Sequence, residues 1–367
     1  MRAFGSFLLL LSVLVLSACS DLSSAPSQRS GKIAVLLPLS GSAASFGSEM
    51  RDAVTLAISE RGSGLEVQFF DTAGTEDGAR TAGVAARSFG AELVLGPLIG
   101  RNIAAVRQGL GNGPAIISFS NDIRRAGRNN FIFSVTPAHA TTRILQFAAQ
   151  NQQTNLGLLY PDNIQGQAAL DATKRAARPL GLTVVAALPY SVDAGREGAT
   201  SRQETAQQMG DLREEIDALF LPDSGGRLRE VASLAFFYQL NPDAEAYLGT
   251  HLIDDPALAT EPALNGAHFA AIGGSLEPFR TRFANQFETS PRLFSVAAYD
   301  AMSLASSLVL SGQGLSPATL MNPSGFTGVL GTYRLRQDGT TERLLAIKRL
   351  GPQGIEVVEP AATSFLF

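Results

Sequence analysis

The sequence of 367 residues contains a single cysteine, and this scarcity excludes several kinds of site. One cysteine cannot close a disulfide within the chain, and it cannot supply a metal cluster that needs several thiolates. The three histidines, His139, His251 and His268, lie far apart in the sequence and lack the spacing of metal ligands. We therefore expect no metal and no cofactor, and we expect each histidine to have a structural role.

The sequence also lacks the short motifs that most often indicate catalysis. The segment Ser40–Gly47 follows a strand-like run, as a phosphate-binding loop would, but it has no lysine to reach a phosphate. No Gly-x-Ser-x-Gly segment is present, so the nucleophile turn of a hydrolase is missing. The net charge of −4 comes without basic runs interleaved with aromatic residues, the pattern typical of nucleic-acid binding. These absences predict a protein that is not an enzyme and has no nucleic-acid partner.

The N-terminal segment has the composition of an export signal followed by a tether. Arg2 supplies a positive charge, and Phe7–Leu16 form an apolar run too short to span a bilayer. The run ends in Leu16-Ser17-Ala18-Cys19, which resembles the lipobox of bacterial lipoproteins, so we predict a signal peptide over 1–18 and lipid attachment at Cys19. Residues 19–30 are polar and serine-rich, as a flexible tether would be. An ordinary signal peptide that leaves the cysteine as a spare thiol is the alternative.

From Gly31 onward, apolar strand-like runs alternate with helix-like segments. The runs are continuous and aliphatic, which is typical of parallel strands covered by helices on both faces. The same order of strand, loop with proline and glycine, helix and strand begins again at Asn155. Because 367 residues exceed one typical domain, we predict an α/β chain of two doubly wound, Rossmann-like lobes.

The first lobe can be divided into elements from its periodicity. The first helix-like segment carries one apolar stripe, made by Met50, Ala53, Val54, Ala57 and Ile58. Near the C-terminus, Asp338-Gly339 between two strand-like runs indicates a hairpin. We expect, in chain order, strand 32–37, helix 47–60, strand 65–70, helix 76–88, strand 91–95, helix 102–110 and strand 115–118.

Several longer stretches carry a family resemblance. KIAVLLPLSGSAASFGSEMRDAVTLAI, residues 32–58, resembles the first strand, loop and helix of type I periplasmic binding proteins, in particular the leucine and branched-chain amino-acid receptors. LGPLIGRNIAAV and SVAAYDAMSLA resemble more narrowly the lipoproteins called penicillin-binding protein activators, a branch of that fold. The resemblance implies two lobes joined by three crossings, near 135–136, 270–273 and 322–328. It implies these boundaries: lobe 1 over 31–135 and 274–322, and lobe 2 over 136–273 and 323–361.

Polar side chains follow several predicted strands at the edge where the lobes would face each other. Ligands of such folds bind outside the carboxyl ends of the strands. A small polar ligand between the lobes would meet some of these candidates: Ser40, Ser42, Arg101, Ser118, Ser120, Asn121, Asp162 and Asp223. The resemblance adds Phe46, where the family carries an aromatic residue near the ligand. For each serine, a turn or a helix cap is the alternative role.

The resemblance implies two functions of different classes. One is a regulator that docks on a penicillin-binding protein and promotes cell-wall synthesis; the other is a receptor that delivers a solute to the membrane subunits of an ABC importer. The receptors place serines after Gly96-Pro97, where this sequence has Leu98-Ile99-Gly100-Arg101, and usually have tyrosine where Ile164 or Gln165 stands here. We therefore expect the regulator. It would be periplasmic and lipid-anchored. Ser20 and not aspartate follows the cysteine, which by resemblance to bacterial lipoproteins implies transfer to the outer membrane.

The variant Cys19→Ala tests the anchor. Because the tether and the folded body are separate in the sequence, the variant should fold normally and leave the membrane fraction. Each buried CH₂ of a lipid chain contributes about 0.8 kcal/mol, so several chains hold the wild type stably at a membrane. Immunoblotting of separated soluble and membrane fractions measures the difference, and a variant that stays with membranes as fully as wild type would mean that something else attaches it.

Overall fold

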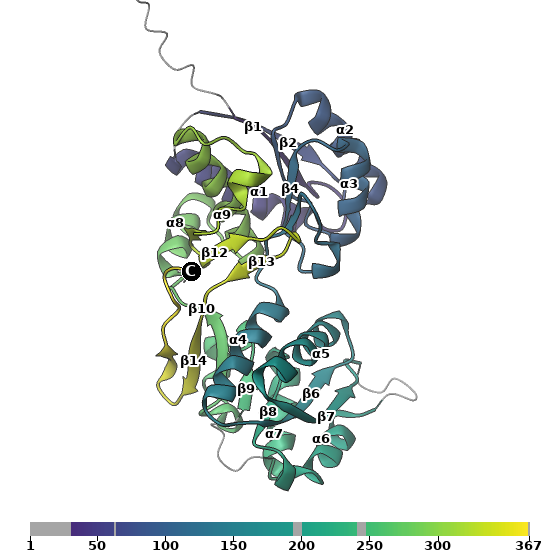
Figure 1. Cartoon of the computed structure of the whole chain (residues 1–367), viewed down its shortest axis with the longest axis vertical. Coiled ribbons are helices and arrows are strands. Elements are labelled where there is room, and N and C mark those ends of the chain that lie inside the picture. Colours follow the sequence, from purple (N-terminus) through teal and green to yellow (C-terminus); the bar gives the residue numbers. More distant parts are fainter. Residues whose placement is uncertain (1–30, 62–63, 194–199, 241–246, 366–367) are drawn as a thin grey trace, which may run out of the picture.

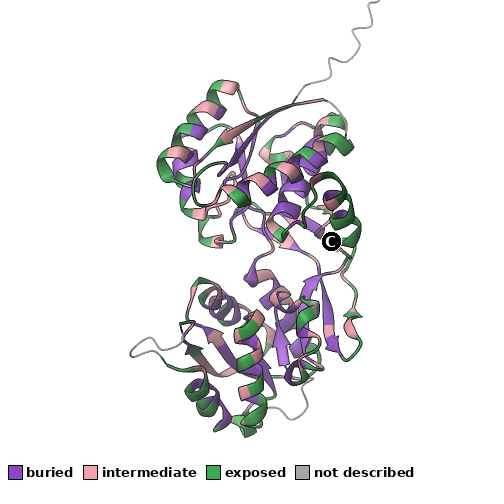
Figure 2. Cartoon of the chain, turned by 180° about the vertical axis from the view of Figure 1, so that it is seen from behind, coloured by how far each residue is buried: buried purple, intermediate pink, exposed green. Residues whose placement is uncertain are grey.

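The computed structural model describes residues 31–61, 64–193, 200–240 and 247–365. In these ranges the chain forms two bodies stacked along the long axis of the molecule, each with helices around a central sheet (Figure 1). Buried residues lie along the strands of both sheets and on the helix faces turned toward them (Figure 2). The predicted α/β architecture of two doubly wound lobes is confirmed. The predicted signal peptide, Cys19 and tether lie outside the described residues.

The first body has a parallel sheet with the strand order β2-β1-β3-β4-β5. Its elements are β1 (Gly31–Leu37), α1 (Ala44–Arg61), β2 (Leu65–Asp71), α2 (Glu76–Phe89), β3 (Leu93–Leu95), α3 (Ile103–Leu110), β4 (Ala115–Ser118), β5 (Asn130–Ile132), α8 (Glu277–Phe287), α9 (Leu293–Leu310) and α10 (Pro317–Leu320). Ile33 and Val35 of β1 share a core cluster with α1 and α9, whereas Ala34 and Leu36 pack with α2 and α3. Burial on both faces explains why these strands read as unbroken aliphatic runs.

The second body has a mixed sheet with the strand order β15-β14-β10-β9-β8-β6-β7. Its elements are α4 (Pro137–Gln150), β6 (Asn155–Pro161), α5 (Ile164–Ala177), β7 (Thr183–Tyr190), α6 (Arg202–Gly210), β8 (Ala218–Phe220), α7 (Gly225–Phe237), β9 (Tyr247–Gly249), β10 (His268–Ile272), β14 (Leu345–Gly351) and β15 (Gly354–Glu359). The strands from β6 to β10 are parallel, and β14 and β15 extend the sheet in antiparallel pairing. The C-terminal part of the chain therefore completes a sheet that the middle part began.

The loop that opens the first body is closed tightly against its helix. Gly41, at a φ of 76°, turns the chain, and the amide of Ala44 donates to the Gly41 carbonyl at 3.2 Å. Helix α1 therefore begins at Ala44, earlier than the predicted start at Gly47. A side chain at Gly47 would place its Cβ 2.0 Å from the Pro38 carbonyl oxygen, so this glycine allows the helix to rest on the loop.

Helix α9 is the central helix of the first body. It is long and apolar enough to cross a membrane, with a mean hydropathy of 1.5, but 72% of the segment is buried inside the fold. Tyr299 is 3% exposed and meets the ring of Phe279 edge-on at 4.9 Å. This helix is therefore a core helix, and the predicted core position of Tyr299 is confirmed.

A small antiparallel sheet lies beside the end of β5. Its strands are β11 (Phe326–Gly328), β12 (Gly331–Leu335) and β13 (Thr341–Arg343). The turn between β12 and β13 confirms the predicted Asp338-Gly339 hairpin, and Gly339 has a φ of 82°. A Cβ at Gly339 would lie 2.3 Å from the Asn130 carbonyl oxygen, so the glycine lets the turn reach the first sheet. There the Ile132 amide donates to the Gly339 carbonyl at 2.9 Å.

This small sheet affects where the boundary between the lobes lies. Residues 323–361 were expected in the second lobe, but strand pairing puts 345–359 in the second sheet and leaves 326–343 beside the first. We therefore propose a boundary that differs from the expected one. The chain would then pass finally into the second lobe near Leu344. Because β10 continues to Ile272, the preceding passage would begin at Gly273.

Asp300 of α9 joins the small sheet to the first body. Its carboxylate oxygens accept hydrogen bonds from the amides of Val329 at 2.7 Å and Leu330 at 2.9 Å. Burial raises the pKa of Asp300 to about 6, although the two amides act in the opposite direction. A side chain at Gly328 would collide with this carboxylate at 2.5 Å, so the strand approaches the helix as closely as a glycine permits.

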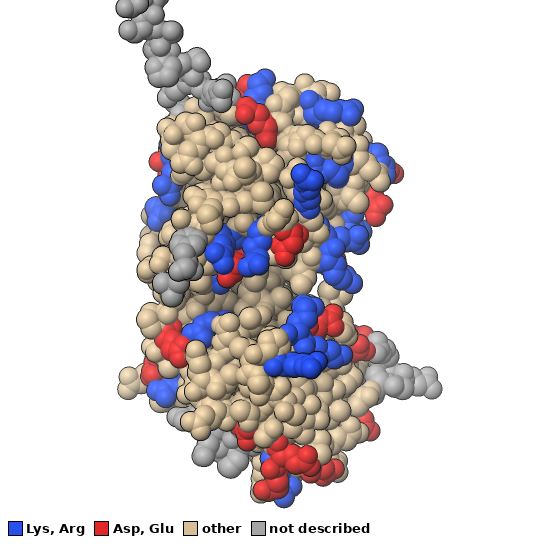
Figure 3. All heavy atoms as spheres, viewed as in Figure 1, with Lys and Arg blue, Asp and Glu red and all other residues tan. Residues whose placement is uncertain are grey.

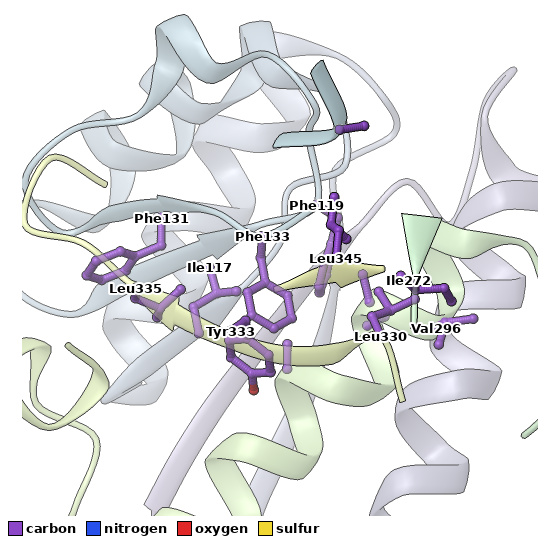
Figure 4. Packing of buried hydrophobic residues seen from close by; sticks show 14 of the residues in the cluster. Ile117, Phe119, Phe131, Phe133, Ile272, Val296, Leu330, Tyr333, Leu335 and Leu345 are labelled. Atoms are coloured by element: carbon purple, nitrogen blue, oxygen red, sulfur yellow. The ribbon is translucent and has the colours of Figure 1, made fainter. Parts of the chain in front are cut away.

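Arg343 joins the small sheet to the segment that leaves β5. Its guanidinium carbon lies 4.8 Å from the ring centre of Phe133 and 5.0 Å from that of Tyr333. The two rings meet edge-on at 4.8 Å and point toward each other in Figure 4. Nη2 of Arg343 donates to the Phe133 carbonyl at 2.9 Å. This buried stack holds the small sheet against the segment that follows β5.

Two histidines make the free energy of unfolding depend on pH. Burial lowers the pKa of His139 and of His251 to about 4, and the charge of Arg343 adds to the effect on His139. Because the folded pKa lies below the unfolded value, the unfolded chain takes up protons first as the pH falls. The stability that these neutral histidines contribute is therefore present above about pH 6.5 and is lost as the pH falls toward 4.

Urea unfolding of wild type, His139→Gln and His251→Gln at about pH 7 and about pH 5 tests this dependence. Wild type should lose free energy of unfolding between about pH 7 and about pH 5, and each histidine variant should lose up to about 2 kcal/mol less. This is an upper bound because neither histidine is fully buried. Asp300→Asn is the control of opposite sign. A raised carboxyl pKa contributes stability that is present at low pH and lost as the pH rises through 6, so this variant should make the acid loss steeper. Identical pH slopes in all four proteins would contradict the assignment.

Candidate functional site

A cavity of about 350 Å³ lies between the two bodies at the carboxyl ends of their strands. We call it the interlobe cavity, and the space-filling view shows the surface hollowed at this level (Figure 3). The first body contributes the segment 121–124, which follows β4, and the second contributes the end of β6 and one face of α5. Its lining residues are Asn121, Asp122, Ile123, Arg124, Pro137, Tyr160, Asp162, Asn163, Ile164, Gln165, Gln167, Ala168, Asp171 and Arg175.

The first-body wall of this cavity carries a two-pronged ion pair. Nε and Nη2 of Arg124 donate to the two carboxylate oxygens of Asp122 at 2.8 and 3.0 Å, and Arg125 lies 3.5 Å from the same carboxylate. The hydrogen bonds from Arg124 hold the pKa of Asp122 below its ordinary range, although burial opposes them. Asp122 and Arg124 therefore both stay charged, and each largely neutralises the charge of the other.

The second-body wall is the first part of α5. Asn163 caps the helix by accepting a hydrogen bond from the Gly166 amide at 2.9 Å. Ile164 is 74% exposed, which leaves a large aliphatic side chain at the cavity edge. Burial raises the pKa of Tyr160, and the nearby carboxylates of Asp162 and Asp171 act in the same direction. The cavity thus combines carboxylates, guanidinium groups and some aliphatic surface.

Of the residues that the sequence suggested for ligand contact, the structure brings Asn121 and Asp162 into this cavity. Ser118 and Ser120 lie close by but are buried and bonded within the first body. Oγ of Ser118 donates to the Pro97 carbonyl at 2.8 Å and accepts from the Ser120 amide at 3.2 Å. Oγ of Ser120 accepts from the Asp122 amide at 3.0 Å. The two serines therefore shape the loop from inside.

Asp223 is likewise occupied by its own surroundings. It is 1% exposed, and its carboxylate accepts hydrogen bonds from the Tyr190 hydroxyl at 2.8 Å and from Arg227 at 2.8 and 3.0 Å. The Ser224 amide donates to it at 2.8 Å. Burial, with the carboxylate beside it, raises the pKa of Tyr190 far above its ordinary value. Asp223 is therefore positioned to hold β7 and α7 together.

The remaining candidates lie on the first body outside the lining of the interlobe cavity. Ser42 and Arg101 are exposed. Ser40 is exposed, and its side chain is hydrogen-bonded to Asp71. Burial alone would raise the pKa of the Asp71 carboxyl. The hydrogen bonds from the Ser40 side chain and from three backbone amides outweigh burial, so the pKa of Asp71 is lowered. Phe46 meets the Phe294 ring edge-on at 5.5 Å, and the Arg292 guanidinium lies 4.5 Å from its ring centre. These four residues do not form one site with Asn121 and Asp162.

A second cavity, of about 220 Å³, lies at the crossings between the bodies. It contains the ion pair of Lys348 and Asp254, 2.9 Å apart, and the ring of His251, whose buried Nδ1 has no hydrogen-bond partner. Lys348 is 9% exposed. In the described chain, no group of three or more histidine, cysteine and carboxylate side chains is arranged to hold a metal ion.

On the α5 wall of the interlobe cavity, Ile164 and Gln165 were noted from the sequence only as the positions where the receptors have tyrosine, and the rest of the wall was not expected. Ile164, Gln167, Asp171 and Arg175 line it from successive helical turns, at positions i, i+3, i+7 and i+11. This spacing puts them on one helix face, so the three polar residues could have been found from the polar periodicity of the helix. Arg124 was not expected either, although its pairing with Asp122 lies within one short loop.

Three comparisons place the chain among known proteins. A family model described as periplasmic binding protein matches residues 30–354, and a search of curated proteins found no match. An ABC transporter substrate-binding protein from Sphaerobacter thermophilus is 17% identical, with 91% of this chain and 98% of that one covered and a TM-score of 0.69. The C-domain of LpoA from Haemophilus influenzae, described as a regulator of PBP1A, is 18% identical, with 89% and 100% covered and a TM-score of 0.68.

A solute-binding protein of an ABC transporter from Rhodopseudomonas palustris, solved with 3,4-dihydroxybenzoic acid, is similar as well. It is 18% identical, with 92% of this chain and 97% of that one covered and a TM-score of 0.61. At such identities the solved structures establish the common fold, and they include both solute-binding proteins and a regulator. Since the family model spans most of the sequence, the chain belongs to the periplasmic binding protein family.

Proposed function

We propose that this protein is a periplasmic, lipid-anchored regulator that activates a penicillin-binding protein by direct contact and so promotes peptidoglycan synthesis. The observation that carries the proposal is the internal bonding of the groups that would hold an amino-acid ligand. Ser118, Ser120 and Asp223 all have protein partners at hydrogen-bond distance and are at most 4% exposed. Membership of the family supports a periplasmic location, and the LpoA C-domain offers a precedent for regulation on this fold.

The physical reason lies in the cost of breaking such bonds. A ligand that took Ser118 as a partner would leave the Pro97 carbonyl or the Ser120 amide without its hydrogen bond inside the protein. An unsatisfied buried polar group costs about 1–3 kcal/mol, which would offset the bond gained with the ligand. Contact through the outer surface would break none of these internal bonds, so these loops of the chain are poorly suited to capturing an amino acid, whereas its surface stays available for protein binding.

The alternative is a solute receptor of an ABC importer, and the interlobe cavity favours it. The cavity holds guanidinium and carboxylate groups from both bodies, including Arg124, Asp162 and Arg175, and Ile164 adds an aliphatic side chain. Such a lining suits a small zwitterion or a carboxylate with an apolar part. Relatives on this fold bind small molecules, as the dihydroxybenzoic acid complex illustrates.

Ser118→Ala separates a structural serine from one that contacts a ligand. The variant should lower the free energy of unfolding by about 1–3 kcal/mol, because a buried carbonyl and amide lose their partner. Ser42→Ala is the matched control: it removes an exposed hydroxyl and should change stability by less than about 0.5 kcal/mol. Urea unfolding measures both. If Ser118→Ala kept full stability but abolished a ligand-induced rise in melting temperature, the serine would belong to a binding site.

The function is tested by adding the purified full chain to a penicillin-binding protein of the same bacterium and measuring glycan polymerisation. We expect a higher rate with wild type and an unchanged increase with Ser42→Ala. In a parallel thermal-shift assay, no common amino acid or short peptide should raise the melting temperature, since a ligand that binds only the folded state would stabilise it by mass action. If an amino acid raised the melting temperature by several degrees and the protein had no effect on polymerisation, we would reject the regulator and adopt the importer receptor.

A further inference from the structure

Helix α7 presents two adjacent aromatic side chains to solvent. Its buried stripe consists of Leu228, Val231, Ala232 and Ala235, which recur at helical spacing. Phe236 and Phe237 follow directly, and successive residues are rotated by about 100° around a helix, so both leave the stripe. The two residues are 59% and 73% exposed. An aromatic pair of this exposure on a folded surface indicates an interaction site.

These two rings form one side of a shallow groove of about 900 Å³. We call it the α7 groove, and its other lining residues are Arg213, Glu214, Ile216, Asp217, Ser233 and Gln239. Ile216 adds an aliphatic side chain to its floor. The groove therefore offers a hydrophobic strip bordered by polar and charged groups, which is the composition of a protein-binding surface with an apolar centre and a polar rim.

The short segment that joins α6 to β8 borders the groove and is predominantly acidic; we call it the acidic rim. It carries Asp211, Glu214, Glu215 and Asp217, with Arg213 as its one basic residue, and of these Arg213, Glu214 and Asp217 line the groove itself. Glu214 is 87% exposed, and its pair with Arg213 spans 3.4 Å. In Figure 3, Asp and Glu spheres gather at the lower end of the molecule, where Figure 1 places α6 and α7.

Asp217 makes part of this acidic rim rigid. Its Oδ2 accepts hydrogen bonds from the amides of Thr154 and Asn155, both at 2.9 Å. The carboxylate is thus fixed at the start of β8, while Glu214 and Glu215 extend into solvent beside it. A partner segment would meet a fixed negative group near the rings and adaptable ones further out.

We propose that the α7 groove binds a basic amphipathic segment of a partner protein, with apolar side chains against Phe236 and Phe237 and lysines or arginines against the acidic rim. The inference rests on the proposed function and names the surface and the partner chemistry it uses. A second copy of this chain is disfavoured as the occupant because it would bring a second acidic rim, and like charges oppose association. The groove also lies at the opposite end of the molecule from β1, where the described chain begins, so an N-terminal tether leaves it accessible (Figure 1).

The test uses the full chain in phosphatidylcholine nanodiscs and a fluorescent synthetic helix with leucines on one face and lysines flanking them. Fluorescence anisotropy should show binding that Phe236→Ser/Phe237→Ser weakens about tenfold or more, as expected for central aromatic contacts. Glu214→Lys/Glu215→Lys should weaken binding as well. Because this second variant keeps both aromatic rings, it still tests the proposal if the serine variant folds poorly. Leu310→Ser, which removes an aliphatic side chain 52% exposed at the end of α9, is the matched control and should bind as wild type does. A helix with glutamates in place of the lysines should not bind.

Equal binding of the lysine helix by wild type and both groove variants would overturn the proposal. The proposal would also be overturned if sedimentation showed that wild type forms dimers and that Phe236→Ser/Phe237→Ser does not. The occupant of the groove would then be a second copy of this chain. The penicillin-binding protein assay separates the two proposals. If the groove variants lose peptide binding but wild type does not stimulate the penicillin-binding protein, the groove proposal stands and the regulator proposal is rejected. If both groove variants stimulate the penicillin-binding protein as fully as wild type does, the regulator proposal stands and the groove is rejected as its contact surface.

Discussion

The buried stack of Phe133, Arg343 and Tyr333 is the contact that holds the small sheet against the first body just before the chain enters the second sheet. Arg343 ends β13 and reaches back across 210 residues of sequence to the Phe133 carbonyl, one residue beyond β5. The chain enters β14 directly afterwards, at Leu345, whose carbonyl accepts a hydrogen bond from Arg143 of α4. Arg343 is 6% exposed, and its buried Nε and Nη1 have no hydrogen-bond partner. Separating the segments around it would also remove the Phe133 carbonyl and the two rings from this buried charge, and that loss is costly.

The loops and the cavities differ in whether their polar groups already have hydrogen-bond partners within the protein. In the loops, buried hydroxyls and carboxylates such as Ser118 and Asp223 have protein partners at close range. In the interlobe cavity and the α7 groove, charged side chains keep much of their surface in water, as Arg124 and Glu214 do. Binding energy is available where groups are exposed and positioned, and it is largely spent where they are buried and bonded. This contrast is why we propose recognition at the α7 groove, and leave the interlobe cavity as the place where a small ligand would bind.

The two accessible surfaces are separated by the thickness of the second body. The interlobe cavity is built on α5, and the α7 groove lies on a helix that packs with α6 against a different core cluster of the same sheet. One face of the β6–β10 sheet thus supports the wall between the bodies, and the other supports the exposed aromatic pair. A partner at the groove and a small molecule at the cavity would not compete for space.

Much of the first body could be predicted from the sequence, because periodicity is a local property of neighbouring residues. The unbroken aliphatic runs predicted strands covered on both faces, the stripe from Met50 to Ile58 predicted the inward face of α1, and Asp338-Gly339 predicted the hairpin. The start of α1 was predicted three residues late, and β5, α8 and α10 were not among the expected elements. Which polar side chains are free to bind is settled by contacts between distant parts of the chain. Ser118 is satisfied by a carbonyl 21 residues away, and Asp223 by a tyrosine 33 residues away. Whether a serine at the end of a strand faces a ligand or a neighbouring loop depends on such distant atoms, and no local pattern contains them.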